Sequence, residues 1–320
     1  MRKLHSLGSW FGMGALGLVL LAAGAAGCAA GSPVGADCDS GADCESGACR
    51  DGVCVDAETT TGSGGAGGEG GGASQATATS SSTSTGSGVC MPNGDGTVER
   101  SELPLGPGLS ATYRVASDVT VDLVGTGSGA DRVWDFSGAF PGDKSIVIET
   151  TALGGTWYGG IFPNASYSSR LADSSDLLGV FALGDTALAL VGVVSPAEGV
   201  SRTELTYETP VPTLQFPLSE SSAWQADSNV SGLAQGIGAF YIEQYEFDVD
   251  ARGTVKTPFG DFPVLRLRVD LTRWIGAVPT TQRSFVFVAE CFGPVATVVS
   301  QPNELTVEFT SASELRRLTP

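Results

Sequence analysis

The chain has 320 residues, of which 42% are hydrophobic and only 16% are charged, and its formal net charge is −18. Phosphate backbones repel such an acidic chain, so nucleic-acid binding is not expected. The single histidine is His5, near the N-terminus. The rest of the chain therefore cannot form a Ser-His-Asp triad or a Cys-His pair, whereas chemistry that uses two carboxylates stays open.

Residues 1–27 have the organisation of a secretory signal peptide. Arg2 and Lys3 precede an apolar run over residues 10–26 that ends in small residues. A retained membrane helix is the alternative, but the run is short and glycine interrupts it. The tetrapeptide AAGC that ends at Cys28 resembles the bacterial lipobox, which implies that this cysteine is lipidated, for example with palmitate. Its first Ala stands where that family usually has Leu, and cleavage by an ordinary signal peptidase is the competing interpretation.

The lipobox resemblance implies an exported protein that is anchored to a membrane through its lipid. Ala29 follows the anchor, and an Asp at this position would be the inner-membrane retention signal. By analogy we expect the chain at the outer membrane or the cell surface.

The cysteine count agrees with export. The chain has seven cysteines, so lipidation of Cys28 leaves an even number, and an exported protein is expected to pair them. Two local bridges and one long-range bridge would use the six that remain: Cys38, Cys44, Cys49, Cys54, Cys90 and Cys291. The pairing within the first four stays open. A metal site is the alternative there, but no histidine and no CxxC pair accompanies them.

Residues 37–54, DCDSGADCESGACRDGVC, resemble the Dickkopf-type cysteine-rich modules of myxobacteria-like secreted lipoproteins. Residues 56–88 consist almost entirely of Gly, Ser, Thr and Ala, a composition that predicts a disordered linker with an r.m.s. span of roughly 30 Å. The expected organisation is therefore a signal peptide (1–27), a lipid anchor with a cysteine-rich segment (28–55), a linker (56–88) and one large domain (89–320).

Residues 91–102 contain a pattern similar to an EF-hand calcium loop. Asn93, Asp95 and Glu102 would supply oxygen ligands, and Gly96 would allow the sharp turn. Met91 stands at the first ligand position, where its side chain offers no hard oxygen. The alternative is a turn followed by a short capped helix. Weakly bound Ca²⁺ is the one cofactor that this sequence suggests.

The large domain alternates between apolar and polar residues with a period of two, which is typical of half-buried strands. Alternating runs occur at 119–123, 265–271 and 305–309, runs that are apolar on both faces occur at 187–194 and 285–288, and a hairpin turn is expected at Phe259-Gly260. No amphipathic helix of a dozen residues follows residue 110. The pattern predicts an all-β fold, either an antiparallel β-sandwich or a curved half-barrel.

Two stretches of this domain resemble known envelope proteins. Residues 253–271 and 285–300 resemble bacterial envelope proteins in which a long hairpin precedes a GPV strand. Several of those proteins fold as curved sheets like the periplasmic lipoprotein carriers, which hold acyl chains in a concave face. The WDFSG phrase at 134–138 is similar to one found in secreted β-rich bacterial proteins.

Three groups of residues could carry chemistry. Four carboxylates follow one predicted strand, with two arginines on the next: Glu243, Glu246, Asp248, Asp250, Arg266 and Arg268. We expect them to form cross-strand charge pairs on a solvated face, with a catalytic dyad as the alternative. Trp157 and Tyr158 could stack on a sugar or pack in the core. The glycines at 125–129 precede a predicted strand at 132–136, which indicates a hairpin and disfavours a phosphate loop.

These patterns predict a membrane-anchored cell-envelope lipoprotein, without catalytic function, that acts as a binding or structural module. Its small-molecule, lipid or glycan ligand is not named by the sequence. The alternatives are a carbohydrate-active enzyme that uses a carboxylate pair and a calcium-dependent adhesion module.

Overall fold

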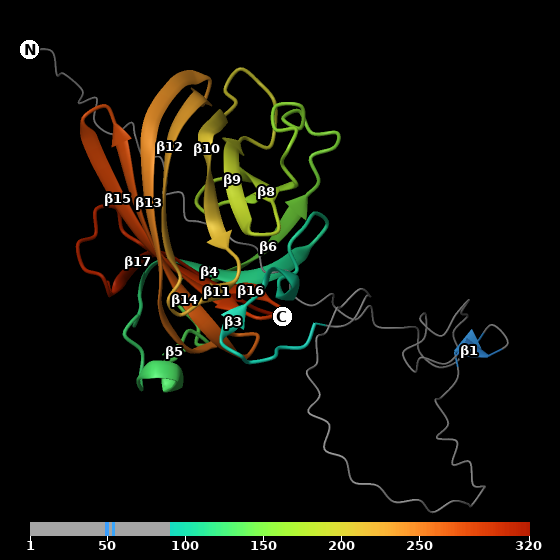
Figure 1. Cartoon of the computed structure of the whole chain (residues 1–320), viewed down its shortest axis with the longest axis vertical. Helices are drawn as coiled ribbons and strands as arrows, with labels where there is room; N and C mark the ends of the chain where they lie inside the picture. Colours follow the sequence, from blue (N-terminus) through green and yellow to red (C-terminus); the bar gives the residue numbers. More distant parts are fainter. Residues whose placement is uncertain (1–48, 51–52, 55–89) are drawn as a thin grey trace, which may run out of the picture. The chain divides into compact units, whose positions relative to one another are not determined.

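The computed structural model describes residues 49–50, 53–54 and 90–320 (Figure 1). The predicted signal peptide, Cys28, Cys38, Cys44 and the whole predicted linker (56–88) lie outside these residues. In the cysteine-rich segment, β1 (Cys49–Arg50) pairs with β2 (Val53–Cys54) in antiparallel fashion, with Cys49 opposite Cys54. The disulfide pairing of this segment stays a prediction.

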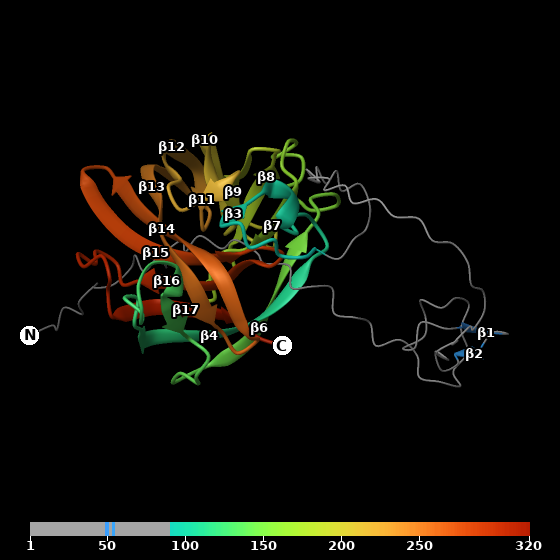
Figure 2. The same ribbon diagram turned by 60° about the horizontal axis from the view of Figure 1, so that its bottom comes forward.

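Residues 90–320 form a closed antiparallel β-barrel (Figures 1 and 2). Its twelve strands are β4 (Ser110–Thr120), β6 (Lys144–Thr151), β7 (Tyr167–Arg170), β8 (Leu178–Leu183), β9 (Ala187–Val194), β10 (Glu204–Gln215), β12 (Ala223–Ala234), β13 (Ile237–Lys256), β14 (Asp261–Ile275), β15 (Val278–Ala289), β16 (Gly293–Ser300) and β17 (Ser311–Leu318). Around the barrel their order is β12-β10-β9-β8-β7-β6-β4-β17-β16-β15-β14-β13, and the pairing of β13 with β12 closes it.

The all-β, antiparallel prediction is confirmed. Closure makes the sheet a barrel and distinguishes it from the sandwich or half-barrel that the strand pattern suggested. A closed sheet has no free edge, because every strand in it has two neighbours.

Five short elements of residues 90–320 lie outside the barrel. β3 (Thr97–Val98) pairs with β11 (Leu218–Ser219), and β5 (Val133–Asp135) runs parallel to the C-terminal end of β13. Two 3-10 turns, η2 (Arg100–Glu102) and η3 (Gly129–Asp131), complete the described structure. No helix of the part that the structure describes is long and apolar enough to cross a membrane.

The barrel interior is filled by side chains, and β13 shows how the sequence selects them. Every second residue from Tyr241 to Val249 is buried, whereas the residues between them are exposed or partly exposed. Successive side chains of a strand point to opposite faces, so this alternation separates an interior face from a solvent face.

A second layer covers part of the outside. Trp134 of β5 and Phe136 pack against Phe287 of β15, with ring centroids 5.1 and 5.5 Å apart, and Phe309 packs against Phe285. β15 is therefore buried on both faces over residues 284–289, as its apolar sequence predicts.

Most of the predicted strands are present. The runs at 187–194 and 265–271 lie in β9 and β14, the 132–136 run contains β5, and the hairpin turn at Phe259-Gly260 joins β13 to β14. The run at 119–123 is strand only to Thr120.

The prediction of a strand at 305–309 was wrong. This segment is an irregular loop, in which Leu305 is 90% exposed and Phe309 is buried. The loop lies on the outside of the barrel, and its alternation arises because one side chain packs against β15 while others point to solvent.

The long-range disulfide is confirmed, because Cys90 is bonded to Cys291. It links the beginning of the barrel domain to the turn between β15 and β16. The backbone N–H of Cys291 also donates to the carbonyl of Glu102 at 2.9 Å, so the 91–102 loop is held against that turn by two connections.

Candidate functional site

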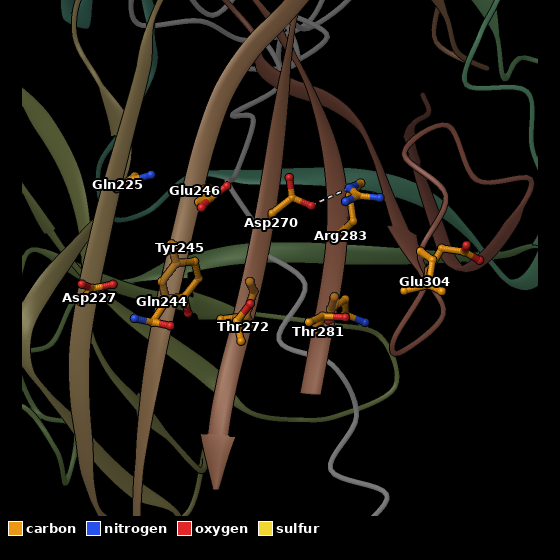
Figure 3. Close-up of a pocket in the computed structure, with 13 residues that line it drawn as sticks. Gln225, Asp227, Gln244, Tyr245, Glu246, Asp270, Thr272, Thr281, Arg283 and Glu304 are labelled. Carbon is orange, nitrogen blue, oxygen red and sulfur yellow. Dashed lines mark hydrogen bonds and ion pairs between the residues drawn. The ribbon is translucent and has the colours of Figure 1, made fainter. Parts of the chain in front are cut away.

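A polar groove of about 460 Å³ lies on the outer face of the barrel across β12, β13, β14 and β15 (Figure 3). This volume is within the range of small-molecule binding sites. Its lining side chains come from adjacent strands and from the loop between β16 and β17, and they include Gln225, Asp227, Gln244, Glu246, Asp270, Thr272, Thr281, Arg283, Glu304 and Leu305.

Strand register arranges the floor of this groove in two rows. One row runs Asp227–Gln244–Thr272–Thr281, and the next runs Gln225–Glu246–Asp270–Arg283. Residues that are directly opposite in antiparallel strands face the same side, so each row places four polar side chains next to one another. The result is a grid of hydrogen-bonding groups on hydrogen-bonded strands.

The row that contains Glu246 and Asp270 holds a like-charge pair (Figure 3). Glu246 lies directly opposite Asp270, an arrangement that is destabilising without compensation. Asp270 is compensated, because Arg283 Nε donates to its Oδ1 at 2.5 Å and Arg268 Nε lies 3.1 Å from its Oδ2. Within residues 90–320, Glu246 has no ion pair with Lys or Arg, and neither has Asp227 in the other row. The groove therefore holds two carboxylates that are available to a ligand.

The neutral groups of the groove offer donors as well as acceptors. Gln244 Oε1 accepts a hydrogen bond from the indole N–H of Trp274 at 3.0 Å, which leaves its Nε2 directed to solvent. The hydroxyls of Thr272 and Thr281 lie beside it in the same row. Donors and acceptors thus occur within one strand spacing of each other.

The 301–310 loop forms one wall of the groove and is held in place by three contacts. Arg266 binds Glu308 through two hydrogen bonds of 2.8 and 3.1 Å, Arg283 Nη1 donates to the carbonyl of Thr306 at 2.7 Å, and the backbone of Thr281 exchanges hydrogen bonds with Asn303. A backbone N–H of Thr306 also binds the Glu304 carboxylate, which lowers the pKa of that exposed group.

Arg266 is itself almost completely buried under the outer layer. It donates two hydrogen bonds to Asp250, at 2.8 and 3.0 Å, and one to the carbonyl of Leu123, while its guanidinium lies over the rings of Trp134 and Phe285. Burial raises the pKa of Asp250 despite this partner.

The four carboxylates predicted to share one solvated face do not do so. Asp248 and Asp250 form the expected cross-strand pairs with Arg268 and Arg266 on the outside, but the second layer covers the Asp250–Arg266 pair, which is therefore not on a solvated face. Glu243, in contrast, points into the barrel and is completely buried, because it has the odd-numbered parity of the interior side chains. The prediction of a common face was therefore wrong for Glu243, and the prediction of a cross-strand charge pair was wrong for Glu246, which lies opposite Asp270.

Glu243 is fully compensated in the interior. Arg273 lies opposite it on β14, with Nε 2.8 Å and Nη2 2.6 Å from Oε1, and the hydroxyls of Tyr207 and Tyr245 donate to Oε2 at 2.8 and 2.6 Å. Burial, followed by the charge of Glu243, raises the pKa of both tyrosines well above its ordinary value, so the hydroxyls stay protonated and can donate. Both carboxylate oxygens of Glu243 therefore have partners within the barrel.

The aromatic pair at 157–160 is a structural element. Tyr158 is 2% exposed and its hydroxyl bonds Ser168, while Trp157 donates its indole N–H to the carbonyl of Ser195. Packing in the core therefore accounts for Tyr158, and sugar stacking does not.

The 91–102 loop brings its three predicted ligands together. Asn93 Nδ2 donates to Asp95 at 3.1 Å and to Glu102 at 2.8 Å, and Glu290 accepts from the backbone N–H groups of residues 93 and 94. Partial burial and the charges of Glu290, Asp95 and Glu99 raise the pKa of Glu102. No group of three or more His, Cys, Asp or Glu residues that could hold a metal ion was found in the described part of the chain. Calcium binding by this loop stays a prediction.

No protein-family model, curated protein or solved structure matches the chain. The function must therefore be argued from the groove itself.

Sequence reasoning missed most of the groove. Gln225, Asp227, Gln244 and Thr272 were not candidates, because each is an ordinary polar residue on the solvent face of its strand. The signal that exists in the sequence is the alternation of β12 and β13, which places all of them outside. Only the register of four strands shows that they are neighbours.

Proposed function

We propose that this protein is an exported, lipid-anchored lipoprotein of the cell envelope whose barrel binds a polyhydroxylated ligand, such as a glycan, without catalysis. The observation that carries the ligand class is the two-row grid, in which carboxylates, amides and hydroxyls lie side by side over four strands. Sugar hydroxyls are both donors and acceptors, so they can pair with such a grid throughout.

Rigidity supports binding at this place. The floor side chains stand on strands with two hydrogen-bonded neighbours each, and the 301–310 wall is fixed by Arg266, Arg283 and Thr281. A preformed site loses little conformational entropy when its ligand binds. The uncompensated carboxylates Asp227 and Glu246 add acceptors that become stronger as the ligand excludes water.

The ligand proposal can be tested by titration calorimetry with a panel of envelope oligosaccharides. We expect at least one to bind, and the double variant Asp227→Asn/Glu246→Gln to lose at least about tenfold in affinity, the effect of one hydrogen bond to a charged group. Asp185→Asn, in the turn between β8 and β9, is the matched control. Equal affinity in the double variant and the control would show that the ligand binds to another surface of the barrel.

The enzyme alternative has its own signature. Asp227 and Glu246 are diagonal neighbours on β12 and β13, the arrangement from which a carboxylate pair could act. Release of reducing ends from a bound oligosaccharide, abolished by either single substitution, would replace the binding proposal with hydrolysis.

The lipid anchor is tested separately. Metabolic labelling with an alkyne analogue of palmitate is expected to mark the wild-type chain and to miss Cys28→Ser. Labelling of both would show that the acyl group is attached elsewhere.

A further inference from the structure

One end of the barrel exposes apolar side chains on neighbouring turns. The β12–β13 and β14–β15 hairpins end on the same side of the barrel (Figures 1 and 2). Ile237 and Phe240 are 72% and 66% exposed on the first hairpin, and Ile275 and Val278 are 53% and 65% exposed on the second. Exposed apolar groups that gather in this way indicate a contact surface.

A third turn joins this end. Val200, which is 94% exposed, belongs to the loop between β9 and β10. A Cβ placed on Gly236 would lie 2.1 Å from the carbonyl oxygen of Val200, so this loop touches the tip of the β12–β13 hairpin. Three turns therefore carry the apolar side chains at this end.

Both faces of the hairpin ends are apolar. Ile275 and Val278 are opposite each other on the interior side, whereas Phe240 and Ile242 point outward. Trp274 lies opposite Ile242 on the outer face, one row from the groove. Hairpins that stand in water normally keep one face polar, so apolar residues on both faces require a different surrounding.

These hairpin ends also lack charge. Residues 228–242 and 274–282 contain no Asp, Glu, Lys, Arg or His, although the chain as a whole carries a formal net charge of −18. A charged side chain at the end of either hairpin would oppose transfer from water to an apolar medium, and none is present.

The shape of this end favours a bilayer over a rigid protein partner. Narrow turns offer little area to a flat protein surface, whereas a stable protein interface buries about 800 Å² on each partner. The headgroup region of a bilayer accepts protruding apolar groups and favours tryptophan at its polar boundary. Trp274 lies at such a boundary. Its ring is opposite Ile242 in the last apolar row, and its indole N–H donates to Gln244 in the first row of the polar groove.

We propose that the uncharged ends of the β12–β13 and β14–β15 hairpins insert into the headgroup region of a lipid bilayer. Insertion of these ends would fix the orientation of the barrel on the membrane. The inference rests on the proposed function only for the lipid anchor and linker that keep the barrel near the membrane. Anchored through the predicted 56–88 linker, the barrel would stay within roughly 30 Å of the membrane, at high effective concentration. The polar groove, on the next rows of the same strands, would then face ligands at the membrane surface.

The experiment uses the chain from residue 28 with Cys28→Ser, so that neither an acyl group nor the apolar run at 10–26 can bind lipid. Its partition onto phosphatidylcholine vesicles is measured by sedimentation. We expect binding that is unaffected by salt, and a loss of at least about tenfold in Phe240→Ser/Val278→Ser. Val124→Ser/Val147→Ser, two exposed valines away from this end, is the matched control. Vesicles with brominated acyl chains should quench Trp274 in the wild type and lose that quenching in Trp274→Phe.

Three results would overturn the proposal. They are no partition of the wild type, equal partition of the two double variants, or a concentration-dependent dimer that only Phe240→Ser/Val278→Ser abolishes, which would assign this end to a second copy of the chain. Because Cys28 is already replaced, each of these results leaves the lipidation test unaffected. Thermal melting of every variant confirms that it is folded.

Discussion

Glu243 and Glu246 lie three residues apart on β13, yet they belong to opposite sides of the barrel wall. The interior carboxylate is completely buried and meets Arg273 and two tyrosine hydroxyls. The outer carboxylate faces Asp270, another acid, and has no ion pair within residues 90–320. The comparison separates charges that maintain the fold from charges that remain available to a ligand.

The largest expected effect comes from the interior side. Arg273→Met would leave Glu243 as a buried charge without a cationic partner, and we expect the free energy of unfolding to fall by about 3–5 kcal/mol. Urea denaturation measures this loss. The double variant Glu243→Gln/Arg273→Met should recover much of it, because the unpaired charge is gone.

Arg268→Met is the outer-face counterpart, since Arg268 is partly exposed and its partners Asp248 and Asp270 can be hydrated. We expect it to cost no more than about 1 kcal/mol. If both arginine variants lost the same stability, the division between interior and outer charges would have no energetic meaning.

A second, smaller effect is expected where an outer charge is covered by the second layer. Arg266→Met removes the hydrogen bonds to Asp250 and Glu308, and the expected loss is about 2 kcal/mol, because both carboxylates keep some contact with water. It should also free the 301–310 loop around Glu308, whereas Thr281 and Arg283 still hold Asn303 and Thr306. Hydrogen exchange at residues 307–309 should become faster and ligand affinity should fall, whereas the exchange of β9 should change little.

The third effect concerns Glu246 itself. Glu246→Gln removes a like-charge contact with Asp270, so the free energy of unfolding should stay within about 0.5 kcal/mol of the wild type or rise slightly. Ligand affinity should fall at the same time. A loss of stability comparable to that of Arg273→Met would show that Glu246 maintains the fold.

The sequence of a single strand predicts which of its side chains point into the barrel and which point outward, but it does not predict which side chains of neighbouring strands meet. The alternation along β13 places Tyr241, Tyr245 and Phe247 on one face, and Glu243 has the same parity. Parity alone therefore separates Glu243 from Glu246. The opposite prediction came from treating four acidic residues as one set because they are close in sequence.

The groove could not be predicted, because it depends on the register of four strands. Gln244 and Thr272 become neighbours only through the pairing of β13 with β14, and nothing local in either strand determines which residues pair. The loop that forms the wall of the groove was predicted as a strand, because residues 305–309 alternate between apolar and polar side chains. Pro302 precedes that segment, and Asn303 has a positive φ of 59°, which disfavours a continuous strand there.

The smallest expected effect is on the pH dependence of the 91–102 loop. Partial burial and three neighbouring acids raise the pKa of Glu102 above 4.5, so the folded state binds its proton more tightly than the unfolded state does. The wild type should therefore gain stability relative to Glu102→Gln as the pH falls from 7 through this region, and should lose it again as the pH rises. Thermal melting at pH 7 and pH 4.5 measures the difference.

Calcium would alter this dependence in a specific way. A cation bound by Asp95 and Glu102 would offset the repulsion at neutral pH, so added Ca²⁺ should raise the melting temperature of the wild type at pH 7 and leave Glu102→Gln unchanged. An identical melting temperature with and without Ca²⁺ would assign the loop a purely structural role. In that case the role of the acidic groups would be to accept hydrogen bonds. Glu102 accepts one from the Asn93 side chain and Glu290 accepts one from the Asn93 backbone, and these bonds hold the loop beside the Cys90–Cys291 bridge.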